Sequence, residues 1–131
     1  MKIYNIFIRH AWKYCDDYYR LEALLDEDSW FHYKNYSVPK HDSLNVKTRR
    51  ELYRELEEQI APCSVVIVIA GMYVEYREWI QIEVAIANKY GKPIVVVKPW
   101  GAERMPLELR CYPVVNWNTD SIVDAIRRYA L

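Results

Sequence analysis

One acidic side chain, Glu83, stands where the surrounding sequence predicts an apolar surface. Residues 76–90 have the periodicity of a helix, at about 100° per residue, with a polar arc opposite an apolar arc. The apolar arc carries Trp79, Ile82, Ile86, Ala87 and Tyr90, and Glu83 projects from its middle, one turn after Trp79. A carboxylate is costly to bury unless it is paired or has a chemical role, and a positioned one can stabilise developing positive charge. Glu83 is therefore the first candidate for a functional-site residue.

Several other segments of the chain have the patterns of strands and helices. Strands are predicted at 3–8, 30–38, 64–70, 94–98 and 112–116. Of these, 64–70 is a continuous β-branched run, which is typical of a strand covered on both faces. The segment 30–38 is weaker and is expected at a sheet edge. Helices are predicted after Asp16 and Asp17, over 46–61, over 76–90 and from Asn118 or Thr119 to about Ala130.

The order of these elements predicts the fold class. Strands alternate with helices, which indicates an α/β protein with a parallel sheet and helices on both faces. We expect a flavodoxin-like three-layer sandwich with five parallel strands in the order 2-1-3-4-5. At 131 residues the chain is expected to form a single domain, 1–131.

Two helix ends carry recognisable signals. Gly91 follows the helix of Glu83 at the position where a left-handed residue commonly ends a helix. Asn118 or Thr119 can cap the last helix through a side-chain oxygen. That helix is expected to turn Ile122, Ala125, Ile126 and Tyr129 inward.

Composition argues against several function classes. Basic and acidic residues number 18 each, so the zero net charge gives no electrostatic footprint for duplex nucleic acid or an anionic membrane. No apolar run has the length of a membrane span, and the first residues are too polar for a signal peptide, so we expect a cytoplasmic protein. The three cysteines and three histidines show no metal-ligand spacing, and no metal site is predicted.

The predicted topology brings distant segments together. In open parallel sheets, ligands bind outside the carboxyl ends of the strands. Four segments are expected there: 9–12 after the first strand, 37–43 after the second, 71–73 after the third, and the first half of the next helix, with Trp79 and Glu83. Glu83 is expected to point across the top of its helix toward the loop after the first strand.

Three motifs in this order resemble those of TIR domains. Residues 7–12 (FIRHAW) are similar to the opening motif of that family, and Trp79 and Glu83 match the W-x-x-x-E of its catalytic helix. Residues 91–97 (GKPIVVV) resemble its fourth strand. The resemblance covers nearly the whole chain and is closest to the bacterial branch that includes the Thoeris anti-phage proteins.

The resemblance implies an activity and a substrate. Enzymatic members cleave the nicotinamide–ribose bond of NAD⁺ and give linear, cyclic or conjugated ADP-ribose signals. Glu83 would then be the catalytic carboxylate, with NAD⁺ as substrate and no further cofactor. Trp79 or Tyr73 could stack on the nicotinamide ring. The phosphate-binding candidates are Arg9, His10 and Lys40, and Trp12, Ser37 and Asp42 complete the predicted substrate-binding set.

Alternatives remain open at this stage. Glu83 could be a structural acid paired with Arg9 or His10, and Arg9 stands where the family usually has Ser. Arg9 could bind the NAD⁺ pyrophosphate, or mark a changed or lost activity. The chain could also be a non-catalytic TIR-like module that binds protein or nucleotide, or a relative of nucleoside deoxyribosyltransferases. The resemblance further implies self-association through TIR surfaces and a separate effector that reads the product.

Overall fold

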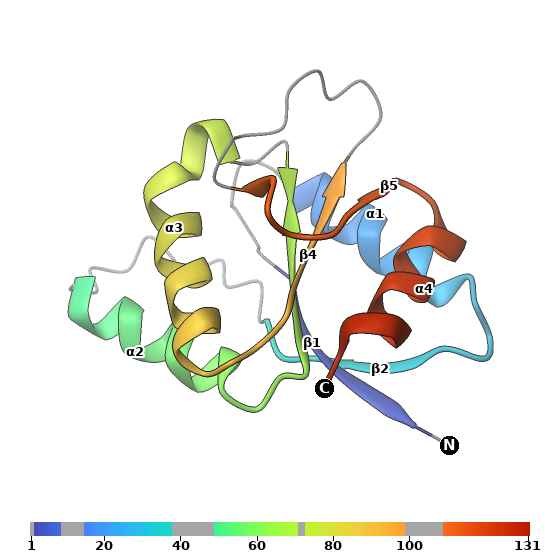
Figure 1. The fold of residues 1–131 in the computed structure, drawn as a ribbon, viewed down its shortest axis with the longest axis horizontal. Helices are drawn as coiled ribbons and strands as arrows, with labels where there is room; N and C mark the ends of the chain where they lie inside the picture. The colour runs from blue at the N-terminus through green and yellow to red at the C-terminus, as the bar shows by residue number, and fades with distance from the viewer. Residues whose placement is uncertain (1, 9–14, 38–48, 71–72, 99–108) are drawn as a thin grey trace.

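The described residues form a five-stranded sheet with four helices (Figure 1). The structure, a computed structural model, describes residues 2–8, 15–37, 49–70, 73–98 and 109–131. Its elements are β1 (Ile3–Ile8), α1 (Cys15–Asp26), β2 (His32–Asn35), α2 (Arg49–Ile60), β3 (Val65–Ile69), α3 (Tyr73–Lys89), β4 (Ile94–Lys98), β5 (Val114–Asn116) and α4 (Thr119–Tyr129).

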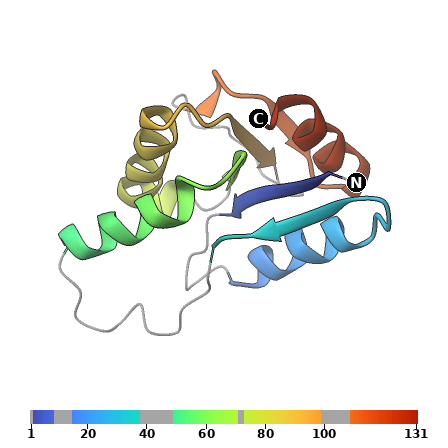
Figure 2. The same cartoon turned by 90° about the horizontal axis from the view of Figure 1, so that it is seen from below.

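The sheet is parallel and has the order β2-β1-β3-β4-β5, so the predicted fold class and strand order are confirmed. Helices α2 and α3 cover one face, and α1 and α4 cover the other (Figures 1 and 2). The register pairs Phe7 of β1 with Val66 of β3, and Ile67 of β3 with Val95 of β4. Because all strands run the same way, their carboxyl ends share one edge of the sheet.

Strand β3 forms the centre of the core. All five of its residues are buried, as the continuous β-branched run predicted. Its neighbours β1 and β4 add Ile6, Phe7, Ile8 and residues 94–97, while α1 and α4 add Leu21, Leu25, Ile122 and Ile126 from one face. Ile60 of α2 and Ile80 and Ile86 of α3 are buried against the other face, so the core lies on both sides of the central strands.

Local capping explains where two helices end or begin. Gly91 has a φ of +66°, and its N–H donates to the Asn88 carbonyl at 3.1 Å. The Lys92 N–H donates to the Ala87 carbonyl at 2.8 Å, which completes a Schellman motif at the end of α3. At the start of α4, the Asn118 side chain accepts a hydrogen bond from the Ser121 N–H at 2.8 Å. Both predicted caps are confirmed.

Several predictions are corrected at the ends of elements. Tyr90 and Tyr129, expected on inward faces, are 39% and 42% exposed. Tyr90 directly follows the last residue of α3, and Tyr129 is the last residue of α4. Helix α3 begins at Tyr73 rather than at residue 76, and β2 is shorter than 30–38 because Trp30 lies in a turn, 84% exposed.

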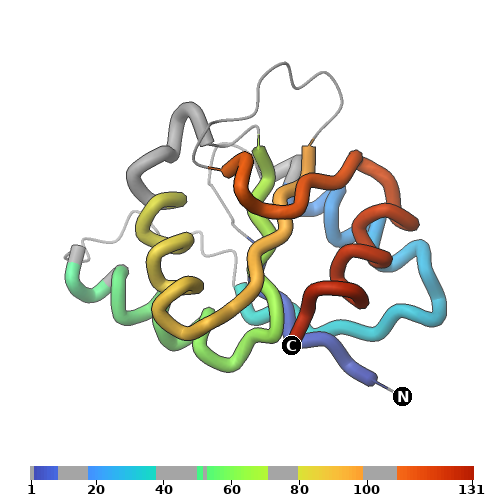
Figure 3. Tube along the Cα trace, in the orientation of Figure 1, coloured from blue at the N-terminus to red at the C-terminus, as the bar shows by residue number. Residues whose placement is uncertain are grey.

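The C-terminal end of the chain packs beside the start of the central strand. In the trace of Figure 3, the last residues return to the segment that leads into β3. There the Leu131 N–H donates to the Ser64 carbonyl at 3.1 Å. Among the described helices, none combines the length and apolar character needed to cross a bilayer.

Candidate functional site

The buried carboxylate of Glu83 is the centre of the candidate site. Glu83 lies in α3 and its side chain is 0% exposed. It shares the buried side of the helix with Ile80, one turn earlier, and with Ile86 and Ala87, one turn later. The prediction that this acid projects from an apolar surface is confirmed. Among the described residues, the buried residues of the polar and charged types are Glu83 and Ser37.

The direction of α3 relates Glu83 to the carboxyl edge of the sheet. The helix begins at Tyr73, after the end of β3, and runs back along the sheet (Figure 1). The Glu83 Cα lies about 15 Å along the helix axis from its first residue. Cα–Cβ bonds in a helix tilt toward its N-terminus, so the Glu83 side chain leaves the backbone in the direction of that edge.

The structure describes the other predicted site residues only in part. Tyr73 is the first residue of α3 and Trp79 lies one turn before Glu83, and the structure describes their backbone positions but not their side chains. The remaining candidates, apart from Ser37, lie outside the described residues: Arg9, His10, Trp12, Lys40 and Asp42. Their roles stay predictions.

Ser37 lies just after β2, at the carboxyl edge, and is 6% exposed. Its hydroxyl donates to the Asn35 side-chain oxygen, and its N–H donates to the same oxygen at 3.0 Å. The Tyr18 hydroxyl lies 3.0 Å from the Ser37 hydroxyl and 3.2 Å from the Ser37 carbonyl oxygen. These bonds fix the backbone where the chain leaves β2.

Tyr18 and Asn35 form the centre of this polar network, and sequence reasoning did not single them out. The Asn35 amide donates to the Tyr18 hydroxyl at 2.6 Å and to a Glu22 carboxylate oxygen at 3.1 Å. Burial raises the pKa of Tyr18, so its hydroxyl stays protonated and can donate. Nothing in the sequence pairs it with a polar residue in the next strand.

Removing the Tyr18 hydroxyl tests the strength of this network. We expect Tyr18→Phe to lower the free energy of unfolding by about 1–3 kcal/mol, because buried polar atoms of Asn35 and Ser37 lose a partner. Urea denaturation measures the change. Tyr19→Phe on the same helix is the matched control, since Tyr19 is 48% exposed, and is expected to change the value by less than about 0.5 kcal/mol. Equal effects of the two changes would contradict a stabilising role of the network.

Metal binding finds no support in the described residues. In the five described segments, no three side chains of His, Cys, Asp or Glu gather closely enough to hold a metal ion. Cys63 is buried, and burial raises the pKa of its thiol to about 12, so it stays protonated at neutral pH. Among the described residues, the Glu83 carboxylate therefore remains the candidate for a reactive group.

Comparison with protein families identifies the chain. A family model described as "Thoeris protein ThsB, TIR-like domain" matches residues 7–104, more than half of the chain. The chain belongs to this family. Every site residue predicted for this TIR-like domain, from Arg9 to Glu83, lies within the matched range. The resemblance on which those predictions depend is therefore confirmed at the level of the family.

A solved structure shares the fold of this TIR-like domain. It is the Clostridium botulinum CMP N-glycosidase BcmB, with 18% sequence identity and a TM-score of 0.54. The similarity covers 95% of this chain and 99% of the other. At this identity the similarity shows the fold alone. None of the curated protein sequences compared with the chain matches it.

Proposed function

We propose that this TIR-like domain is an NAD⁺ glycohydrolase or cyclase that produces an ADP-ribose-derived signal in anti-phage defence. The observation that carries the proposal is the Glu83 carboxylate, fully buried on the helix that follows the central strand. A buried acid is expensive to keep in a core, and a catalytic role is one reason to keep it. Membership of the Thoeris TIR-like family supports the choice of NAD⁺.

The proposed reaction breaks the bond between the ribose C1′ and the nicotinamide nitrogen. The bonding electrons go to the pyridinium ring, so nicotinamide leaves as a neutral molecule and needs no strong general acid. Positive charge develops on the ribose, and the Glu83 carboxylate stabilises it, as carboxylates do in glycoside hydrolysis. Water then captures C1′ and releases a proton, which gives ADP-ribose, or an internal nucleophile captures it, which gives a cyclic product.

The other predicted residues have positioning roles in this proposal. Trp79 or Tyr73 stacks on the nicotinamide ring, whose positive charge favours an aromatic face. Arg9, His10 and Lys40 bind the phosphates. Trp12, Ser37 and Asp42 complete the substrate-binding set, Ser37 from a backbone that Tyr18 and Asn35 hold in place. Self-association and a separate effector that reads the product belong to the same proposal.

A second candidate is N-glycosidic cleavage of a nucleoside monophosphate. It is favoured by the fold shared with a protein described as a CMP N-glycosidase. Both reactions break a bond between a ribose carbon and a base nitrogen, so the same carboxylate could serve either. They differ in the leaving group, because cytosine lacks the positive charge of nicotinamide and needs a proton to leave well.

Substrate assays separate these candidates from a non-catalytic role. Purified protein is incubated with NAD⁺ or with CMP, and released nicotinamide or cytosine is measured by chromatography. The assay is repeated in lysate from phage-infected cells, where a trigger is present. We expect nicotinamide release from NAD⁺ in at least one condition. Cytosine release alone would favour the second candidate, and release of neither base in both conditions would favour a binding module.

A further inference from the structure

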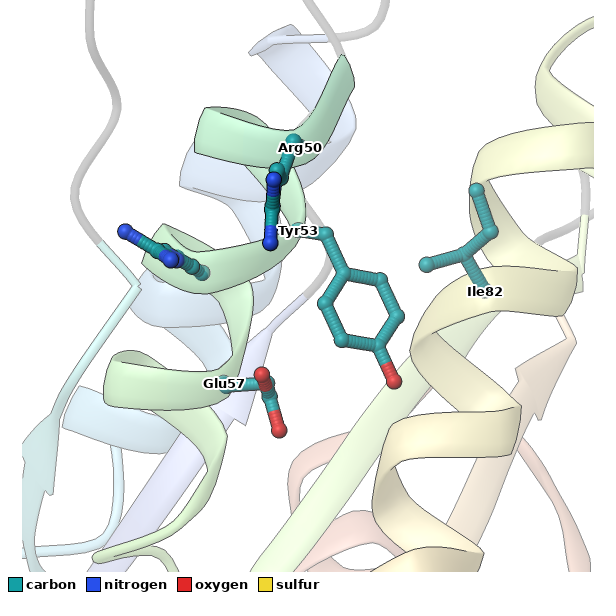
Figure 4. A pocket seen from close by; sticks show the side chains of 5 residues that line it. Arg50, Tyr53, Glu57 and Ile82 are labelled. Atoms are coloured by element: carbon teal, nitrogen blue, oxygen red, sulfur yellow. The ribbon is translucent and has the colours of Figure 1, made fainter. Parts of the chain in front are cut away.

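A groove lies between α2 and α3 (Figure 4). Its volume is about 470 Å³, within the range of small-molecule sites. Arg50, Tyr53, Arg54 and Glu57 of α2 line it, together with Ile82 of α3. Ile82 and Glu83 are consecutive in a helix and point about 100° apart. The groove therefore borders the helix of the catalytic candidate without containing its carboxylate.

The charge of this groove is mainly positive. Arg50 and Arg54 lie one turn apart on α2, and both are exposed. Within the described part of the chain, the ion pairs are Lys89–Glu57 and Arg127–Asp28, so neither groove arginine belongs to one. Each guanidinium group carries several N–H donors that can bind an anion.

The one acidic residue that lines the groove is already engaged. Glu57 accepts hydrogen bonds from the Lys89 ammonium at 3.0 Å and from the Tyr90 hydroxyl at 2.8 Å. These bonds lower the pKa of Glu57, so it is ionised, and its charge interacts mainly with Lys89 and more weakly with Arg54. The other acids of α2 do not line the groove: Glu51, Glu55 and Glu58.

Two residues of the groove's lining, Tyr53 and Ile82, are aromatic or apolar. Tyr53 and Ile82 are half-buried, and the Tyr53 ring extends from α2 toward Ile82 across the space between the helices (Figure 4). A phenol ring beside an aliphatic side chain offers a surface on which a planar group can stack. A lining that combines arginines with an aromatic ring suits a ligand that has both a phosphate and a flat ring.

We propose that the α2–α3 groove binds a small phosphorylated ligand with a planar ring, of the nucleoside monophosphate class. Arg50 and Arg54 bind the phosphate, and Tyr53 with Ile82 contacts the ring. This site is separate from the site around Glu83, and its occupation does not require the proposed reaction. A ligand bound there contacts Ile82 on the flank of α3 that faces α2.

Nuclear magnetic resonance of isoleucine methyl groups tests this binding in the full chain. Ile82 reports on the groove, and Ile82→Val assigns its signal. Buried Ile126 in α4, on the other face of the sheet, is the reference. We expect AMP to shift the Ile82 signal in a saturable way, with a Kd of about 1 mM or below, and to leave the Ile126 signal in place. Inorganic phosphate should compete with AMP, and adenosine should bind at least about 10-fold more weakly.

Charge variants decide whether the arginines bind the phosphate. Arg50→Gln/Arg54→Gln is expected to weaken the AMP effect at least about 10-fold. The matched control is Arg20→Gln/Arg128→Gln, which removes two exposed arginines from α1 and α4 on the other face and should leave the affinity unchanged. An Ile82 response that survives loss of Arg50 and Arg54, or no response to AMP up to about 10 mM, overturns the proposal.

A third variant separates this site from the proposed reaction. Glu83→Gln is expected to keep the AMP response of Ile82, because its side chain lies on a different side of α3. If AMP instead bound only at the candidate active site, Glu83→Gln would alter the response and the groove variants would not. That result would overturn the groove proposal and leave the proposed function standing.

Discussion

Replacement of Glu83 by Gln is expected to abolish nicotinamide release while leaving the fold intact. Gln has nearly the same shape but carries no charge, so it cannot stabilise a positive ribose in the transition state. Loss of one preorganised electrostatic group commonly costs about 10²–10³-fold in kcat, and we expect at least that here. The measurement is the rate of nicotinamide release at saturating NAD⁺, with circular dichroism to verify the fold.

A matched variant makes this expectation specific. Glu58→Gln removes the same charge from an exposed position on α2 and should leave the rate within about twofold of the unmodified protein. Glu83→Asp retains the carboxylate but shortens it, and should give an intermediate rate. If Glu83→Gln released nicotinamide at the rate of the unmodified protein, the catalytic assignment of Glu83 would be refuted.

The largest expected loss of stability comes from Ile67→Ala. Ile67 lies at the middle of β3, 0% exposed and paired with neighbours in both β1 and β4. Truncation removes buried methyl groups and leaves a cavity that a close-packed sheet cannot fill. We expect a decrease of about 2–5 kcal/mol in the free energy of unfolding, a large share of the roughly 5–15 kcal/mol typical of a domain. Urea denaturation monitored by tryptophan fluorescence measures it.

Ile3→Ala is the control for this change. Ile3 also lies in a strand, β1, but is 58% exposed, so the same substitution there removes little buried surface. Both variants replace Ile by Ala in a strand, so both lose the same β-propensity, which is worth up to about 1 kcal/mol. The difference between them therefore reports burial. A difference below about 1 kcal/mol would contradict the central place of β3 in the core.

The sequence predicted only those features of the site that depend on local patterns. Periodicity was enough to predict the buried side of α3 and hence the unusual position of Glu83. It could not predict the network of Tyr18, Asn35 and Ser37, because those residues contact one another across a helix and a strand that are 17 to 19 positions apart. The arginine groove was missed for a related reason. It exists only because α2 packs beside α3, and no sequence pattern gives the distance between two helices.

Two tyrosines show the limit of periodicity most clearly. Tyr90 and Tyr129 have the angular positions of inward residues, yet both are partly exposed. An angle around a helix states which way a side chain points, but burial also requires that another element extend that far along the axis. At the last residue of a helix that condition depends on the lengths and positions of neighbouring elements.

Local chemistry in the sequence was thus sufficient for the strands, their parallel order, the caps at Gly91 and Asn118, and the acid on an apolar helix face. The strands, the caps and the acid depend on backbone preferences or on residues within a few positions of one another, and the parallel order follows from the alternation of strands and helices along the chain. Tertiary structure alone decided which polar groups satisfy one another at the exit of β2, and where two helices leave a charged groove between them. Those features depend on distances between elements, which are set by the packing of the whole core.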